Sequence, residues 1–547
     1  MCGISAILLG DVKATTAAVE LHESIYYLQH RGQDAAGITV CQGGRLYQMK
    51  GNGLASKVFQ EPARLADNLP GYGGISHVRY PTAGTSSASE AQPFYDSPFG
   101  LSLAVNGNLV NSQELRSFLD LEARRHVNTD SDSELLLNVY AHALHELGKA
   151  RANADDIFAG LRDVYARCNG GFACVAMITG FGILGFRDEN GIRPLCLGSR
   201  PSATLEGALD YFMASESVAL TQLGFTNIVD ILPGQAVFIQ KGGKPQFRQI
   251  VPMKSYTPDI FEHVYFSRPD STSDGISVHR SRQNMGRKLA DKVREILGEK
   301  GVEEIDVVIP IPEPGQKARQ QGIRRKLSPI QAEFRDKVVL LVDDSIVRGN
   351  TSREIVLMSR EAGAKKVILA SCSPEITHPH VYGIDLADPA QLVAHGKTRE
   401  QIAKEIGADE VITCLLPITV FLEQKLTAPD NPQLIYQSLD DLQAACFEAI
   451  EGETKVTGFE VGVFSGHYQT EVPESYFQHL SELRASKGRK RKSPDEQPQP
   501  DGHPDDPRKM TLVANGGPVN GPSSPPPAAA ASPAQEPEAM TSQEDIR

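Results

Sequence analysis

The chain has 547 residues and a formal net charge of -13 at pH 7. This length allows two or more domains, each with its own core, and the negative charge argues against general binding to nucleic acid or to an anionic membrane. No signal-peptide pattern opens the chain, and its longest uncharged apolar run, CLLPITVFL from Cys414, is too short to span a bilayer. These features predict a cytoplasmic enzyme with no nucleic-acid or membrane partner.

Residues 1–255 are predicted to form a β-rich domain. Helices are expected at Ala17–Leu28 and Ser133–Leu147, where apolar residues recur at helical spacing. Between turn signals lie short runs typical of strands. These runs are ISAILL, GITVCQ, GYGGISHVRY, LSLAVNGNL, FACVAMI, ILGFRD and QAVFIQ.

Residues 256–480 show a different pattern, in which apolar strands alternate with helices and so indicate a parallel α/β sheet. The segments are DVVIPIP, VVLLVDD, SREIVLMSREAGA, KVILAS and REQIAKEIGA. Residues 481–547 are rich in Pro, Ser, Gly, Ala and charge, which predicts a disordered tail. The run KGRKRK from Lys487 fits a solvated basic linker better than a nuclear address.

The eight cysteines contain no C-x-x-C pair, so neither zinc nor an iron–sulfur cluster is expected. Cys2 stands apart because loss of Met1 would place its thiol and a free α-amino group on one residue. With an ordinary pKa of about 7.7–8.0, that amine could accept the thiol proton directly or through one water. An incidental cysteine is the simpler interpretation unless other residues support the site.

Arg79 offers the first support, because it ends a strand beside a Pro-Thr turn that contains Thr82. It could hold a substrate carboxylate with two hydrogen bonds, although an exposed arginine at a strand end is the simpler interpretation. The dipeptide Asn106-Gly107 predicts either a tight hairpin turn or an oxyanion hole. In the second case the Asn106 amide and the Gly107 N–H would face the developing negative charge.

The stretch NTDSDSELLLN follows, and its Ser131 and Glu134 match a capping box at a helix start. Asp130 and Asp132 are then left over, and either could accept hydrogen bonds from a substrate ammonium group. A site that holds a carboxylate and an amine beside a thiol and an oxyanion hole suits glutamine.

Together, the N-terminal CGI, LQHRGQD, HVRYPTAG, NGNL and SDSE resemble the class II glutamine amidotransferase domain. The resemblance implies an N-terminal-nucleophile hydrolase fold, an αββα sandwich. It also implies that Cys2 is the nucleophile and that Asn106 and Gly107 stabilise the oxyanion. Arg79, Thr82 and Asp132 would bind glutamine.

The stretch VVLLVDDSIVRGNTS predicts a second site. VVLLV shows no polar alternation and should be a buried parallel strand, so Asp343 and Asp344 would stand at its carboxyl end, where such sheets bind ligands. They could hold a ribose diol or a hydrated Mg²⁺, and the N–H groups of the following helix start could receive a phosphate. Two ordinary turn aspartates are the simpler interpretation. The residues predicted to bind this substrate are Ser345, Arg348, Gly349, Asn350, Thr351 and Ser352.

This second stretch resembles the phosphoribosyl pyrophosphate motif of phosphoribosyltransferases. With VYFSRPDSTSDGISVHRSRQNMG and the first domain, it makes the chain similar to the amidophosphoribosyltransferase family. The resemblance implies glutamine and phosphoribosyl pyrophosphate as substrates, Mg²⁺ as cofactor, and a closed passage for ammonia between the sites. It further implies a homo-oligomer inhibited by purine nucleotides, and the cysteine pattern places the chain in the cluster-free branch.

The chain departs from that family in two places. After Ile311-Pro312-Glu313-Pro314, roughly thirty to thirty-five residues are missing, enough for a crossover helix, a strand and a lid. An insertion occupies about Cys414–Leu434. A missed exon and a translated intron would explain both, as would real divergence. The missing segment keeps open a catalytically impaired relative, with glutaminase or nucleotide-binding capacity only. Other amidotransferases carry an isomerase-like or ATP-pyrophosphatase domain, which VDDSIVRG argues against.

Overall fold

The computed structural model describes residues 1–80, 87–97, 99–149, 151–311, 329–384, 386, 388–407 and 434–478. Several predicted features lie outside these ranges. They are Thr82, the junction from Pro312, nearly all of the insertion near Cys414–Leu434, and the tail 481–547.

Two antiparallel sheets form the first half of the chain. The first sheet has seven strands in the spatial order β11 (Thr226–Asp230), β9 (Cys196–Pro201), β10 (Leu209–Ala214), β1 (Gly3–Leu8), β4 (Gly73–Arg79), β2 (Ala35–Gln42) and β3 (Arg45–Asn52). The second has six strands in the order β13 (Pro245–Gln249), β12 (Gln235–Gln240), β8 (Gly182–Arg187), β7 (Gly170–Ile178), β6 (Leu101–Leu109) and β5 (Phe94–Asp96).

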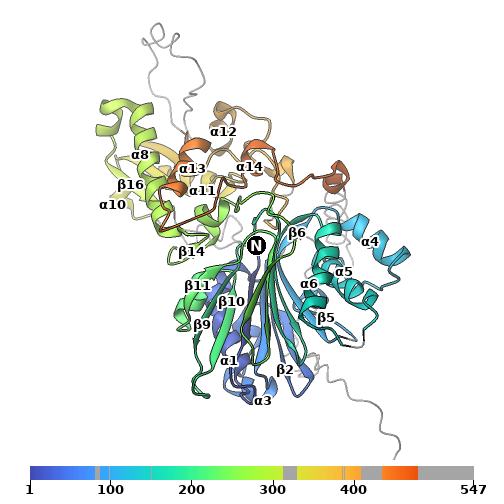
Figure 1. Ribbon diagram of the computed structural model, residues 1–547. Coiled ribbons are helices and arrows are strands. Elements are labelled where there is room, and N and C mark those ends of the chain that lie inside the picture. The colour runs from blue at the N-terminus through green and yellow to red at the C-terminus, as the bar shows by residue number, and fades with distance from the viewer. Residues whose placement is uncertain are drawn as a thin grey trace, which may run out of the picture. The chain divides into compact units, whose positions relative to one another are not determined.

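Helices cover the outer face of each sheet, as Figure 1 shows. Helix α1 (Ala17–Leu28) packs on the seven-stranded sheet, while α4 (Ser112–Leu121), α5 (Asp132–Glu146) and α6 (Ala154–Arg167) pack on the six-stranded one. Apolar side chains such as Ile4, Ile75 and Val175 fill the space between the sheets. The predicted αββα sandwich is therefore confirmed. Short helices α2 (Ala55–Val58), α3 (Leu65–Asn68) and α7 (Ser217–Gln222) complete this half.

Two local predictions in this half are wrong. Asn106-Gly107 makes no hairpin, because β6 continues through it and Gly107 pairs with Phe172 of β7. Ser131 does precede α5, but its side chain makes no capping bond. Glu134 instead accepts hydrogen bonds from the N–H group of Thr129 and from its hydroxyl, at 2.7 and 2.6 Å, so it stabilises the preceding loop.

A parallel sheet forms the second half, as predicted. Its order is β16 (Val307–Pro310), β17 (Val338–Asp343), β18 (Lys366–Ser371) and β19 (Leu434–Tyr436). Helix α8 (Val278–Glu303) packs on one face, and α11 (Asn350–Glu361) and α12 (Arg399–Ile406) pack on the other. The remaining elements are η4 (Glu262–Phe266), β14 (Thr272–Ser273), β15 (Ile276–Ser277), α10 (Gln331–Phe334), α13 (Leu439–Phe447) and α14 (Gly462–Ser465).

Strand β16 is an edge strand, hydrogen-bonded within the described ranges to β17 alone. Val308 on this strand is 57% exposed, and Ile330 nearby is 69% exposed. An apolar groove of about 530 Å³ runs beside the strand, lined by residues that include Ile309, Phe334 and Met358. The exposed edge expected from the missing segment is therefore present. None of the helices in the described ranges is long and apolar enough to cross a bilayer.

Candidate functional site

Cys2 lies where β1 enters the sandwich. Gly3 pairs with Val78 of β4, and this register brings Cys2 beside the end of that strand, where Arg79 stands. The Cys2 N–H donates to the Asn106 side-chain oxygen at 3.2 Å, and the Cys2 sulfur lies 3.9 Å from the Tyr80 carbonyl oxygen. Cys2 still carries Met1 here, so its nitrogen is a peptide N–H that would become an amine once Met1 is lost.

Asn106 has one partner and one free donor. Its oxygen accepts from Cys2, whereas its Nδ2 is buried and has no hydrogen-bond partner among the residues that the structure describes. A buried donor without a partner costs about 1–3 kcal/mol, so such groups call for a functional explanation. Next to it, Gly107 has φ of 151°, and a Cβ there would lie 2.1 Å from the Gly171 carbonyl oxygen. Only glycine fits at this position.

Arg79 and Asp132 lie at the same site. Arg79 is buried and pairs with Asp34 at 3.2 Å and with Glu90. Asp132, the first residue of α5, accepts a hydrogen bond of 2.9 Å from the Leu109 N–H at the end of β6. Burial raises the pKa of Asp132, and hydrogen bonds from the N–H groups of Leu109 and Ser133 oppose that rise, as does the more weakly acting charge of Arg79.

The structure also decides between the two candidate aspartates. Asp130 is exposed and lies 3.7 Å from Arg116, whereas Asp132 points toward β6. Asp132 is therefore the acid that belongs to the site.

Sequence reasoning missed Arg31, which is fully buried and donates from Nε to the Cys2 carbonyl oxygen at 3.0 Å. It lies in LQHRGQD, one of the motifs of the family resemblance, which assigned no role to this arginine. The following Gly32 was the available signal, because a Cβ there would lie 2.5 Å from the Arg79 carbonyl carbon. The turn must therefore carry glycine to pack against β4.

Asp343 and Asp344 stand at the carboxyl end of β17, as predicted. The Asp344 N–H donates to Asp343 at 3.1 Å, and the Ser345 hydroxyl donates to Asp344 at 3.1 Å. Burial, followed by the neighbouring Asp344 charge, raises the pKa of Asp343 to about 8. The ionised form of Asp343 is therefore disfavoured by its burial and by the charge of Asp344.

The segment from Ser345 to Ser352 turns into α11, with one difference from the prediction. The helix begins at Asn350, so Asn350, Thr351 and Ser352 form its first turn and not a loop. Gly349 precedes it with φ of 68°, and a Cβ there would lie 2.9 Å from Ile406. The N–H groups of this helix start are suited to a phosphate, and Arg348 is exposed beside them.

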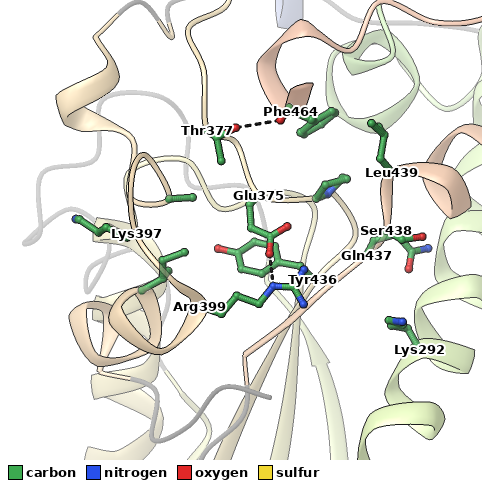
Figure 2. Close-up of a pocket in the computed structure, with 13 residues that line it drawn as sticks. Lys292, Glu375, Thr377, Lys397, Arg399, Tyr436, Gln437, Ser438, Leu439 and Phe464 are labelled. Atoms are coloured by element: carbon green, nitrogen blue, oxygen red, sulfur yellow. Dashed lines mark hydrogen bonds and ion pairs between the residues drawn. The ribbon is translucent and has the colours of Figure 1, made fainter. Parts of the chain in front are cut away.

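A separate pocket of about 460 Å³ lies at the carboxyl ends of β18 and β19, shown in Figure 2. It contains none of the predicted site residues. Arg399 pairs with Glu375, Lys397 with Glu405, and Lys292 with Glu295 at 2.8 Å. Because each of these cations already has a carboxylate partner, we assign no phosphate to this pocket.

Comparison with known proteins decides which family has this pair of sites. The model of the glutamine amidotransferase domain matches residues 77–222, a span that includes Arg79, Asn106 and Asp132. A curated amidophosphoribosyltransferase from Schizosaccharomyces pombe is 49% identical, and the match covers 90% of this chain and 95% of that protein. The chain belongs to the amidophosphoribosyltransferase family. It is a glutamine-dependent phosphoribosyltransferase of purine biosynthesis.

Other amidophosphoribosyltransferases are also similar to this chain over most of its length. The Escherichia coli protein is 44% identical over 88% of this chain and 96% of its own length. A solved structure of the allosteric regulatory enzyme of purine biosynthesis superposes with a TM-score of 0.70 at 30% identity, covering 87% of this chain and 97% of its own. The structure of glutamine phosphoribosylpyrophosphate amidotransferase from B. subtilis, solved with ADP and GMP, superposes with a TM-score of 0.68 at 31% identity. The match covers 86% of this chain and 98% of that one.

The alignment to the S. pombe amidophosphoribosyltransferase also contains positions that have no residue in this chain. It counts 538 positions, but 90% of 547 residues is only about 492, so about 46 aligned positions have no residue in this chain. This number agrees with a deletion of the predicted size, together with smaller gaps.

Proposed function

We propose that this amidophosphoribosyltransferase uses two sites in turn. At the first, the Cys2 thiolate attacks the side-chain amide of glutamine, forms a thioester and releases ammonia, and water then releases glutamate. At the second, ammonia displaces pyrophosphate from phosphoribosyl pyrophosphate to give 5-phosphoribosylamine. The proposal rests on one observation above all, the free and buried Asn106 amide beside Cys2.

Each residue of the first site has a role in this proposal. Asn106 Nδ2 and the Gly107 N–H would stabilise the oxyanion, a contribution of about 3–4 kcal/mol for one donor in comparable sites. Arg79 would bind the glutamine carboxylate, and Asp132 would bind its ammonium group. Thr82, outside the described residues, would make a further contact with glutamine.

At the second site, Asp343 and Asp344 would bind the ribose hydroxyls or the water ligands of Mg²⁺. The donor set fits this ion, because Mg²⁺ is usually held by one or two carboxylates together with substrate phosphates. The raised pKa of Asp343 supports the assignment, since a nearby cation would favour both ionised carboxylates. When bound, Mg²⁺ would neutralise the leaving pyrophosphate. The 5′-phosphate would sit on the segment from Ser345 to Ser352, with Arg348 at its edge.

Ammonia would have to travel between the sites without contact with water. The side chain of Met1 is 1% exposed and packs in an apolar cluster with Tyr256, Ile260 and Phe261. Its removal would therefore open apolar space between the thiol and the second half. We expect the ammonia passage to begin there.

Three further properties are proposed on the strength of the family. The B. subtilis relative was solved with ADP and GMP, and we expect purine nucleotides to inhibit this enzyme too. We also expect a cytoplasmic homo-oligomer without an iron–sulfur cluster. Light scattering of the purified protein would measure its oligomeric state.

The second half supports a reduced synthase activity in the chain as it stands. The exposed edge of β16 and the apolar groove beside it support the absence of a helix and a strand that would cover them. We therefore retain an alternative in which this chain hydrolyses glutamine or binds nucleotides but makes little phosphoribosylamine.

Replacement of the nucleophile tests the proposed function. Cys2→Ala should abolish glutamine hydrolysis, because no other group can form the thioester, while substrate binding at Asp343 and Asp344 should not change. Glutamate release and calorimetric binding of Mg²⁺ with phosphoribosyl pyrophosphate are the measurements. Glutamate release by the Cys2→Ala protein at the unmodified rate would disprove the assignment.

A further inference from the structure

The carbonyl group of Cys2 is held by a chain of buried charges that starts in the second half of the protein. Arg31 donates from Nε to the Cys2 carbonyl oxygen at 3.0 Å. Its two terminal nitrogens bind Glu262 at 2.9 and 2.6 Å, and one of them also binds Glu216 at 2.6 Å. Each of the three nitrogens of this guanidinium therefore donates to at least one buried acceptor.

The three side chains of this hydrogen-bonded series are charged and shielded from water. Arg31 is fully buried, and Glu216 and Glu262 are nearly so. Burial alone would raise the pKa of Glu262, but the Arg31 charge lowers it, so this carboxylate is ionised at neutral pH. Charge-assisted hydrogen bonds of this kind hold their partners in one geometry.

Glu262 is itself fixed by the second half. It opens η4, and the Ser267 hydroxyl donates to it at 2.7 Å. Arg282 of α8 donates to the carbonyl oxygens of Tyr265 and Ser267 at 3.0 and 2.7 Å, which ties η4 to the helix that packs on the parallel sheet. A continuous set of bonds therefore runs from α8 through η4 and Arg31 to the main chain of Cys2.

We propose that Glu262 is a positioning residue for glutamine hydrolysis, acting through Arg31 on the main chain of Cys2. It touches neither the thiol nor the substrate. By clamping Arg31, it fixes the Cys2 carbonyl and hence the direction of the thiol relative to Asn106. Small displacements of a reacting group reduce rates strongly, so loss of this clamp should lower the rate of the chemical step more than it weakens glutamine binding. The inference rests on the proposed role of Cys2.

The test compares Glu262→Gln with Glu262→Asp in the full chain. Glu262→Gln keeps the shape but removes the charge, and we expect the kcat for glutamine hydrolysis to fall by at least tenfold while KM changes less than twofold. Glu262→Asp keeps the charge on a shorter side chain and should recover part of the rate. The alkylation rate of Cys2 by a glutamine-like electrophile should follow kcat in both variants.

Asp274→Asn provides a matched control. Asp274 also belongs to the second half and binds a fully buried arginine of the first, Arg187, at 2.6 and 2.8 Å. Arg187 makes its other hydrogen bonds to the carbonyl oxygens of Ile231 and Gly191 and not to Cys2. This variant should lower the melting temperature as much as Glu262→Gln does, but leave kcat within twofold.

The outcomes separate this inference from the proposed function. Hydrolysis by the Cys2→Ala protein would remove the basis of both. If Cys2 is essential but Glu262→Gln keeps its full kcat, or loses no more than Asp274→Asn, then Glu262 is only structural and the inference is wrong. Selective loss of kcat, with partial recovery in Glu262→Asp, supports it. If Glu262→Gln does not fold, Glu262→Asp is compared with Asp274→Asn: a larger loss of kcat in Glu262→Asp supports the inference, and an equal loss contradicts it.

Discussion

At the scale of single residues, the two sites differ in how their carboxylates are compensated. Burial alone would raise the pKa of Glu216, but Arg31 and His30 lower it to about 2. Asp343 has an acidic neighbour in place of a cation, and its pKa rises to about 8. The Glu216 carboxylate is therefore compensated by protein groups alone, whereas a cation bound beside Asp343 would favour the ionised form of that carboxylate.

The raised pKa of Asp343 predicts a pH dependence for Mg²⁺ and substrate binding. The free folded protein keeps a proton on Asp343 from its ordinary pKa of 3.8 up to about 8, and Mg²⁺ must displace that proton. Binding should therefore strengthen as pH rises from 6 to about 8 and release a proton on the acidic side. By the same reasoning, stability without Mg²⁺ should fall as pH rises through this range, since the unfolded state has already lost the proton.

Calorimetry with Mg²⁺ and phosphoribosyl pyrophosphate, in buffers of different ionisation enthalpy, measures this proton release. Asp343→Asn should bind more weakly and show no release, while alkylation of Cys2 should continue at the unmodified rate. Equal affinity at pH 6 and pH 8 in the unmodified protein would contradict the prediction.

The residues of the second site could be predicted together because they are continuous in the sequence, whereas those of the first site were grouped through the family resemblance. The order strand, Asp343-Asp344, glycine turn and helix is continuous in the sequence, and the structure confirms it. Arg31 and Glu262 could not be paired in this way, because 231 positions separate them and both resemble ordinary surface charges in a single sequence. Only the fold shows that they share one buried site.

At the scale of elements, Gly107 shows how the fold constrains the first site. It lies within β6 with φ of 151°, which side chains rarely adopt, and a Cβ there would strike the Gly171 carbonyl oxygen. Gly107→Ala should therefore add strain and a clash, lowering the free energy of unfolding by roughly 2–4 kcal/mol. It should also disturb the oxyanion N–H and reduce glutamine hydrolysis. Denaturant unfolding and glutamate release are the measurements.

Gly44→Ala separates the cost of backbone strain from the cost of the clash with Gly171. Gly44 also has a positive φ, of 74°, but a Cβ there would meet no atom within 4 Å. This variant should cost about 1–2 kcal/mol from backbone strain alone and leave hydrolysis unchanged. Equal losses of stability in the two variants would show that the contact with Gly171 has no effect.

Prediction at this scale succeeded where burial is uniform and failed where the path of a loop or a mostly polar composition decides. LSLAVNGNL and KVILAS form the strands expected of them, because neighbouring layers cover these runs. Glu134 does not form the predicted capping box. It accepts a hydrogen bond from Thr129 instead, because the path of the preceding loop brings that N–H group to it. Helix α8 was not predicted, although its buried Met285, Leu289 and Val293 recur at helical spacing, because most of its other residues are polar.

At the scale of the whole molecule, the first half is a closed sandwich and the second is an incomplete sheet. Both outer faces of the sandwich are covered by helices, whereas β16 leaves Val308 and the groove beside Ile309 open. Exposed strand edges invite pairing with other chains. We therefore expect the missing segment to affect both phosphoribosylamine synthesis and self-association of the protein.

Restoring that segment should restore synthesis of phosphoribosylamine. In the chain as it stands, we expect Asp343 and Asp344 to hold the substrate from one side only, without a lid that excludes water. Lids position the substrate and shield the reaction, so their loss can reduce the rate on the order of a hundredfold or more. We expect the purified chain to hydrolyse glutamine slowly and to form little phosphoribosylamine from either glutamine or ammonia.

An assay of phosphoribosylamine tests this prediction. It compares this chain with one that carries the corresponding segment of the S. pombe relative between Ile311 and Pro329. The restored chain should form product from glutamine and from ammonia, and Cys2→Ala in that background should keep only the ammonia-dependent reaction. A restored helix and strand should also fill the groove and lower the binding of an apolar dye. Equal turnover by the two chains would show that the sheet works without the segment, because the carboxyl end of β17 alone would then suffice to hold the substrate.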